Sequence, residues 1–175
     1  LATMAYGQGI AVTPLQMISV YATIANGGVW VQPRLVRGTV DPEGAFHPAP
    51  SSSTRRVVSD DTAQMVTRML AFAVKAGTGA AARIPGFRVA GKTGTARIPR
   101  PTGGYYVDRY FASFIGFLPA SDPKVVIAAI LDRPTTEYGG IAAAPLFQQV
   151  ARYAIERLGI APGEALPPPP HAIPR

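Results

Sequence analysis

The sequence predicts an α+β domain in which an antiparallel sheet is flanked by helices. Three strand-like segments follow one another between residues 87 and 131, and helix-like segments lie before and after them without regular βαβ alternation. With 47% hydrophobic residues, a chain of 175 residues can form one core and is unlike a generally disordered protein. We place this domain at residues 1–161 and expect the proline-rich residues 162–175 to form a disordered tail.

The first helix is predicted over residues 15–25. Thr13 is its cap, Pro14 occupies its first position, and two glycines follow its end. Its apolar residues lie on several faces, so we expect it to be mostly buried. Residues 29–40 then have strand character, and residues 41–54 are expected to form a loop rich in proline and serine. Pro33 marks an edge or a bulge in that strand.

A second helix is predicted to start at Ser59, with two aspartates in its first turn and Lys75 in its last turn. Gly77 ends it. A single apolar stripe is predicted for this helix, formed by Val66, Met69, Leu70 and Ala73.

The sheet is predicted from residues 87–96, 110–118 and 124–131. Because only a short link joins the last two segments, we expect them to form an antiparallel hairpin. A third helix is predicted over residues 142–158, and Gly159 ends it. Its apolar residues at four-residue spacing are Leu146, Val150, Ala154 and Leu158.

Composition excludes several function classes. The formal net charge is +7, but the arginines are scattered, and Arg55-Arg56 is the only adjacent basic pair. Specific nucleic-acid binding is therefore not expected, since it requires a clustered basic stripe. There is no cysteine, and the two histidines, His47 and His171, lie in proline-rich segments. We expect no metal site, no cofactor and no catalytic triad built on histidine.

The start of the chain suggests a piece of a longer protein. No apolar run approaches the ~20 residues that a membrane helix needs. The first residues lack both an initiator methionine and the charged-then-apolar order of a signal peptide.

The segment that carries chemistry is Lys92-Thr93-Gly94-Thr95, on the first strand of the predicted sheet. A lysine supplies positive potential, threonine hydroxyls can bind a carboxylate, and glycine lets a ligand approach the backbone. Alternation places Lys92 and Gly94 on one face of the strand and the two threonines on the other. An ordinary exposed strand remains the alternative, because Lys-Thr-Gly occurs by chance in roughly a few per cent of chains of this size.

Four segments, in order, carry a resemblance to a known family. They are residues 4–17, 22–28, 89–96 and 138–147. Over residues 1–160 the chain resembles the C-terminal half of the transpeptidase domain of a class B penicillin-binding protein, of the division type. The family has three motifs, Ser-x-x-Lys, a Ser-x-Asn in class B proteins, and Lys-Thr-Gly.

Two of these motifs are missing here. No Ser-x-Asn occurs, and the only Ser-x-x-Lys is Ser121-Asp122-Pro123-Lys124. That match follows the Lys-Thr-Gly strand, contains proline and lies in a predicted turn, so we reject it as the nucleophile motif. We expect the nucleophilic serine and its lysine to be encoded before Leu1.

The resemblance implies an incomplete fold of the penicillin-binding, serine-acyltransferase type, and part of a peptidoglycan D,D-transpeptidase. Such an enzyme cross-links stem peptides in cell wall synthesis and septal division, and this chain alone should be inactive. By resemblance, Lys92 and Thr95 are catalytic, the Thr95 N–H forming half of the oxyanion hole. Thr93, Gly94 and Thr95 would bind the substrate carboxylate.

The resemblance also implies partners and a location. The ligands would be the D-Ala-D-Ala end of a stem peptide and β-lactams, without metal, cofactor or nucleic acid. Divisome membrane proteins would be partners. The expected location is the extracytoplasmic side of the cell membrane, with an anchor upstream of this chain.

Three other segments could border the substrate groove. Residues 6–9 are either a turn near the cleft or a glycine-rich lead into the first helix. Tyr105, Tyr106 and Tyr110 line the groove or simply pack on the sheet, and residues 77–79 precede the Lys-Thr-Gly strand.

Besides the transpeptidase, two functions of other classes remain open. One is a non-catalytic binding or scaffold module of the same fold, and the other is an unrelated basic binder of nucleic acid or membrane. A Ser-x-x-Lys and a Ser-x-Asn in upstream coding sequence would decide for the enzyme. Salt-sensitive DNA binding would favour the basic binder of nucleic acid or membrane.

Overall fold

Three strands form the antiparallel sheet at the centre of the fold, in the order β5-β6-β7. They are β5 (Ala90–Pro99), β6 (Tyr105–Leu118) and β7 (Val125–Asp132) in a computed structural model that describes residues 10–136 and 138–163. The three predicted strands and the β6–β7 hairpin are confirmed, although β5 and β6 reach further toward their shared hairpin than expected.

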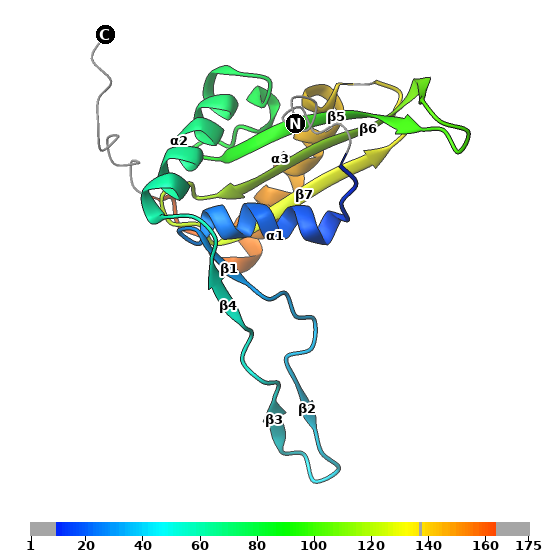
Figure 1. Cartoon of the computed structure of the whole chain (residues 1–175). Helices are drawn as coiled ribbons and strands as arrows, with labels where there is room; N and C mark the ends of the chain where they lie inside the picture. Colours follow the sequence, from blue (N-terminus) through cyan, green and yellow to red (C-terminus); the bar gives the residue numbers. More distant parts are fainter. Residues whose placement is uncertain (1–9, 137, 164–175) are drawn as a thin grey trace.

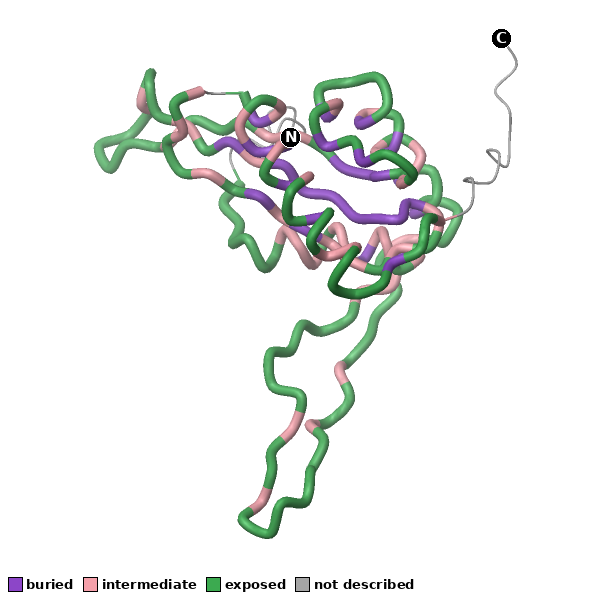
Figure 2. The backbone as a smooth tube through the Cα atoms, turned by 180° about the vertical axis from the view of Figure 1, so that it is seen from behind, coloured by how far each residue is buried: buried purple, intermediate pink, exposed green. Residues whose placement is uncertain are grey.

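Helices cover both faces of this sheet (Figure 1). On one face, α1 (Pro14–Ala25) and α2 (Asp60–Ala76) pack over a cluster around Phe117. On the other face, α3 (Gly139–Leu158) and the short 3-10 helix η2 (Ala80–Ala82) pack over a larger cluster around Phe114. The buried residues run along the middle of the sheet (Figure 2). The predicted α+β class is therefore confirmed.

The signals at the helix ends act as predicted. Thr13 caps α1, its hydroxyl accepts from the Gln16 N–H, and the Gln16 side chain accepts from the Thr13 N–H to complete a capping box. At the start of α2 the Ser59 hydroxyl accepts from the Thr62 N–H, without a capping box, and Gly77 ends the helix. The burial of α1 was predicted wrongly: among its 12 residues only Thr23 is buried. Packing against the sheet and α2 covers one side of α1, and Leu15 and Val20 are exposed on the rest.

The apolar stripes predicted for α2 and α3 are mostly wrong, although Leu70 and Ala154 do pack against the core clusters. In α2 the buried residues are Ala63, Thr67, Ala71 and Val74, whereas Met69 is 61% exposed. In α3 the buried residues are Gly139, Ala143, Ala144, Phe147 and Ala151, and α3 also begins three residues earlier than predicted. Both helices turn small side chains to the sheet, because small residues allow a close approach of helix and strand. Phe147 and Val74 are the larger apolar residues that are buried, whereas others such as Met69 and Leu158 are left on the outer faces.

A long two-stranded arm leaves the domain between α1 and α2 (Figure 1). Its strands are β1 (Val29–Val31), β2 (Gly38–Val40), β3 (Phe46–Pro48) and β4 (Thr54–Arg56). β1 pairs with β4 and β2 with β3, both antiparallel. The single strand predicted over residues 29–40 is thus two strands interrupted near Pro33, because proline has no N–H to donate to a ladder. The loop predicted over residues 41–54 contains β3 and the start of β4.

Two expectations fall partly or wholly outside the described residues. The disordered tail was predicted from residue 162, and the description ends at residue 163. The turn expected at residues 6–9 precedes the first described residue. Within the described part, no helix combines the length and the apolar character needed to cross a membrane.

Candidate functional site

The sheet order places Lys92-Thr93-Gly94-Thr95 on an edge strand. β5 pairs with β6 on one side and, among the described residues, with no strand on the other. The strand leaves the core just before the tetrapeptide, since Ala90 is fully buried whereas Lys92 and Thr95 are exposed. Thr93 and Gly94 are half-buried. An extended ligand can therefore reach this edge through both side chains and backbone.

The register assigns the tetrapeptide side chains to the two faces of the sheet. Thr93 pairs with Phe114, whose ring lies 4.6 Å from the Phe147 ring of α3, so Thr93 and Thr95 lie on the α3 face. Lys92 and Gly94 lie on the face that α1 and α2 cover. The alternation predicted from the sequence is confirmed.

Lys92 nevertheless reaches the threonine side around the open edge. Its Nζ donates to both the carbonyl oxygen and Oγ1 of Thr93, each at 3.1 Å. Thr93 Oγ1 also shares a hydrogen bond of 2.8 Å with Thr78 Oγ1, from the loop between α2 and η2. Thr78 belongs to the loop of residues 77–79, which therefore contacts this strand; that the loop borders a substrate groove stays a prediction. An ammonium group and two hydroxyls thus meet at one point of the edge.

The first turn of α3 lies directly against the tetrapeptide. The Gly139 N–H donates to Thr95 Oγ1 at 3.3 Å. A Cβ at Gly139 would lie 2.5 Å from the carbonyl oxygen of Gly94 and 2.6 Å from that of Ser113, so only glycine fits. Sequence reasoning did not foresee this contact, although two adjacent glycines at the start of a helix are a signal for close approach.

The electrostatics of this edge favour an anion. Among the described residues, no acidic side chain pairs with Lys92. The N-terminus of α3, which carries the positive end of the helix dipole, adjoins Thr95. Positive potential, hydroxyl donors and an open strand edge together can hold a carboxylate. No group of three or more potential metal ligands gathers in the described part of the chain.

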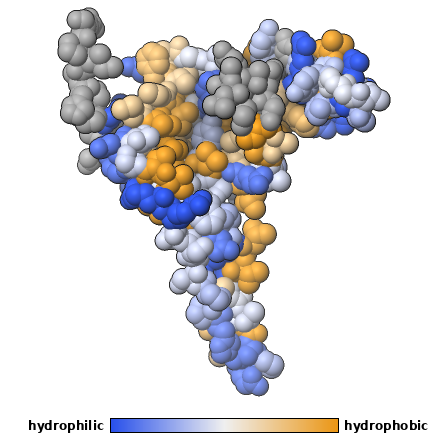
Figure 3. Space-filling model, viewed as in Figure 1, coloured by the Kyte–Doolittle hydropathy of each residue, from blue (hydrophilic) through white to orange (hydrophobic). Residues whose placement is uncertain are grey.

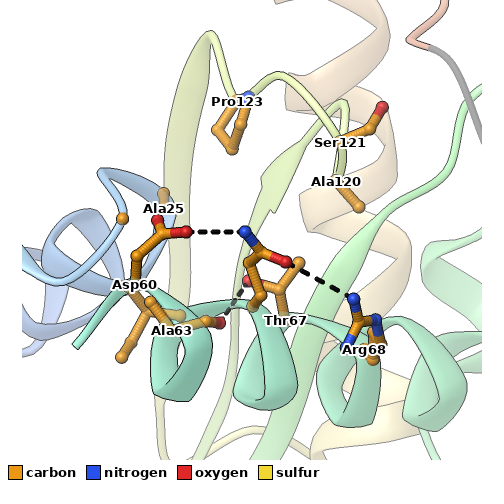
Figure 4. A pocket seen from close by; sticks show the side chains of 11 residues that line it. Ala25, Asp60, Ala63, Thr67, Arg68, Ala120, Ser121 and Pro123 are labelled. Carbon is orange, nitrogen blue, oxygen red and sulfur yellow. Dashed lines mark hydrogen bonds between the residues drawn. The ribbon is translucent and has the colours of Figure 1, made fainter. Parts of the chain in front are cut away.

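The rejected Ser-x-x-Lys match has no geometry for catalysis. Ser121 and Lys124 lie in the turn between β6 and β7, and Lys124 Nζ pairs with Asp122 at 2.7 Å. Ser121 lines a small pocket between α1, α2 and this turn (Figure 4). Polar side chains of α2 on that pocket bond to one another, Gln64 donating to Asp60 at 2.6 Å and accepting from Arg68 at 3.4 Å. None of residues 92–95 lines it.

The three tyrosines lie on the hairpin that extends β5 and β6 beyond the tetrapeptide. The Tyr106 ring lies beneath two guanidinium groups, with Arg109 at 4.3 Å and Arg100 at 5.3 Å from its centroid. Tyr110 lies beneath Arg97 at 5.9 Å. Tyrosine and arginine therefore alternate on an exposed hairpin next to the site rather than in the core.

Comparison with known proteins identifies the family of the chain. The family model "Penicillin binding protein transpeptidase domain" matches residues 1–152. The chain is 41% identical over 167 residues to penicillin-binding protein PbpB of Mycobacterium tuberculosis, covering 89% of this chain and 25% of the relative. It is 34% identical over 169 residues to the "Probable peptidoglycan D,D-transpeptidase PenA" of Neisseria flavescens. That match covers 94% of this chain and 39% of the relative.

A solved structure shows the same relationship. Penicillin-binding protein 3 of M. tuberculosis, crystallised with ampicillin, superposes with a TM-score of 0.82 at 39% identity. The match covers 93% of this chain and 38% of that one. The chain spans about a quarter of the length of the first curated relative it matches.

Proposed function

The chain belongs to the transpeptidase family of class B penicillin-binding proteins, and from this premise we propose that it forms one wall of a peptidoglycan D,D-transpeptidase site. The reaction would cross-link stem peptides in cell wall synthesis and division. The observation that supports it most is the open edge at residues 92–95, where an ammonium group and threonine hydroxyls meet.

Each residue of the tetrapeptide has a role in this proposal. Lys92 supplies positive potential for the terminal carboxylate of the substrate, and the hydroxyls of Thr93 and Thr95 hydrogen-bond to it. Gly94 lets the peptide approach the strand, to which it adds as an extended segment. The Thr95 N–H is one of two donors that stabilise the oxyanion of the tetrahedral intermediate.

The nucleophile comes from sequence outside these 175 residues in this proposal. A serine would attack the penultimate D-Ala carbonyl, the terminal D-Ala would leave with a proton, and a neighbouring amine would take the acyl group. The sequence has no Ser-x-Asn, and its one Ser-x-x-Lys is the turn at residues 121–124. Activity therefore requires a segment that supplies both motifs, and the chain alone would be inactive.

Ligands, partners and location follow from the same premise. The ligands are the D-Ala-D-Ala end of a stem peptide and β-lactams such as the ampicillin seen with the mycobacterial relative. The protein would act outside the cytoplasm, held at the cell membrane with divisome proteins.

Covalent labelling by a fluorescent penicillin tests this function. The chain is combined with a segment that supplies Ser-x-x-Lys and Ser-x-Asn, and the acylation rate is measured. Thr95→Val removes a hydrogen bond to a charged group, worth about 1.5–3 kcal/mol, so acylation should slow about 10- to 100-fold. Lys92→Ala should slow it at least as much.

Lys124→Ala is the matched control, because Lys124 belongs to the rejected Ser-x-x-Lys match and is exposed. It should label at the normal rate. If both site variants label like the parent protein, the assignment of residues 92–95 is wrong. If the combined protein folds but never labels, the chain belongs to a non-catalytic binding module of the same fold.

A further inference from the structure

The arm formed by residues 29–57 has no core of its own. None of these residues is buried, and the arm projects from the domain as a narrow ribbon (Figures 1 and 2). An isolated two-stranded ribbon is marginally stable in water. At the base of the arm Trp30 Nε1 donates to Ser19 Oγ of α1 at 2.8 Å, whereas β2 and β3 pair only with each other among the described strands. This exposed distal part points to a partner elsewhere.

The distal part of the arm has one apolar and one polar face. Val40 pairs with Phe46 and Gly38 with Pro48, so these four residues share a face. The Phe46 ring lies over Gly38, where a Cβ would come within 2.5 Å of it. Val40 is 65% exposed and Phe46 52% exposed. We call this the apolar arm face.

The opposite face carries its own hydrogen bonds. Thr39 pairs with His47 there, and His47 Nε2 lies 2.7 Å from Asp41 Oδ2. The Asp41 carboxylate on this face is thus satisfied within the arm, whereas no other element covers the apolar arm face among the described residues.

The outer edge of β2 has open backbone groups beside this apolar face. Asp41 N–H donates to the Ala45 carbonyl and Ala49 N–H donates to the Arg37 carbonyl, both across the arm. Antiparallel ladders alternate, so the N–H and C=O groups of Gly38 and Val40 point away from β3. Among the described residues, no other strand pairs with that edge. Such an edge is a template for strand addition.

Charge identifies the kind of strand that fits. Residues 29–40 contain Arg34 and Arg37 and no acidic residue. Arg34 donates to the Pro50 carbonyl across the arm, whereas the Arg37 side chain forms no hydrogen bond or ion pair with the described residues. Apolar side chains gather along this side of the arm (Figure 3). A complementary strand is apolar at alternate positions and acidic opposite Arg37.

Two other occupants fit less well. A second copy paired antiparallel through the same edge could offer Arg37 only Asp41 from this strand, and that carboxylate already accepts from the Ala45 N–H and bonds His47. An anionic lipid surface would meet Asp41 and Glu43, which lie at the tip of the arm.

We propose that the outer edge of β2 accepts an extended segment of a partner protein as an additional strand, with apolar residues packing on Val40 and Phe46 and an acidic residue pairing with Arg37. This places a protein-docking site on the arm, separate from the edge at residues 92–95.

The test uses two capped eight-residue peptides, one alternating valine with glutamate and one alternating valine with lysine. Fluorescence anisotropy gives the affinity, and amide hydrogen exchange by NMR reports strand addition. We expect the glutamate peptide to bind about tenfold or more tightly than the lysine peptide. It should protect the amides of Gly38 and Val40.

Charge reversal on the chain provides the decisive comparison. Arg37→Glu should invert the preference between the two peptides without removing any backbone donor. Arg152→Glu makes the same charge change on an exposed residue of α3 and should leave the preference unchanged. Val40→Pro removes one outward N–H and should abolish binding of both peptides.

Four results would overturn the proposal. They are equal affinities for the two peptides, no protection at Gly38 and Val40, an equal response of the two arginine variants, and arm-dependent binding to vesicles of phosphatidylglycerol in place of peptide. Self-association that Val40→Pro abolishes would assign the edge to a second copy instead.

Discussion

Replacing Gly139 by alanine tests whether α3 is seated directly on the candidate site. The new Cβ would lie 2.5 Å from the Gly94 carbonyl oxygen, and ordinary contact begins near 3.4 Å. The first turn of α3 must therefore withdraw by the difference, about 0.9 Å, or the strands must move. The other oxygen in the way, that of Ser113, belongs to the strand paired with β5. Neither carbonyl can turn aside without disturbing the sheet.

The expected cost follows from three terms. Forcing a methyl group into a packed position costs about 1–3 kcal/mol. The bond from Gly139 N–H to Thr95 Oγ1 is already 3.3 Å long, so withdrawal breaks it at a cost of about 1 kcal/mol. Alanine regains about 0.5–1 kcal/mol over glycine in a helix. The net loss in the free energy of unfolding should be about 1–3 kcal/mol.

Gly140→Ala is the matched control for this measurement. Its Cβ would meet the Thr78 carbonyl oxygen at 2.5 Å, but Thr78 lies in an exposed loop that can shift. We expect a change within about 1 kcal/mol, because the gain in helix propensity offsets the adjustment. Urea unfolding gives both free energies, and the amide shift of Thr95 by NMR reports the site. A Gly139→Ala chain as stable as the parent would refute the contact.

Two further predictions concern the core and the arm. Phe147→Ala should lower the free energy of unfolding by about 3–5 kcal/mol, since Phe147 is fully buried. Tyr153→Ala, at a residue of the same helix that is 67% exposed, should lower it by less than about 1 kcal/mol. Similar losses for the two variants in urea unfolding would contradict the assigned core. The hydrogen bond from His47 lowers the pKa of Asp41. The stability that this bond adds is therefore present above the ordinary aspartate pKa, and it is lost as the pH falls through the lowered pKa. His47→Ala should return the Asp41 titration, followed by carbon NMR of the carboxyl, toward the ordinary pKa; an unchanged titration would exclude His47 as the cause.

Features that depend on neighbouring residues could be predicted from the sequence. The cap at Thr13 and the stop at Gly77 formed as expected, because such signals satisfy backbone groups within the same turn. The β6–β7 hairpin could be predicted because a short link between two strands is also a local feature of the sequence.

The choice of the buried helix face could not be predicted in this way. α2 offers large apolar side chains such as Met69 and small ones such as Ala71 on different faces, and hydrophobicity alone favours the former. The helix turns Ala71 inward because close contact with the sheet removes more surface on both sides. That gain depends on the shape of the sheet surface, which cannot be deduced from the sequence of the helix alone. The arm strands were mispredicted because pairing between β1 and β4 joins residues about 25 apart.

The chemistry of the candidate site was determined by the sequence alone. Lys92, Thr93, Gly94 and Thr95 are adjacent, and the strand period by itself sorts them onto two faces. The tertiary structure alone decided what surrounds them. Gly139 is 44 residues from Thr95 and Thr78 is 15 from Thr93, yet they supply the contacts that hold these hydroxyls. Strand geometry is local, whereas the approach of a helix and a loop to that strand depends on the packing of the whole sheet.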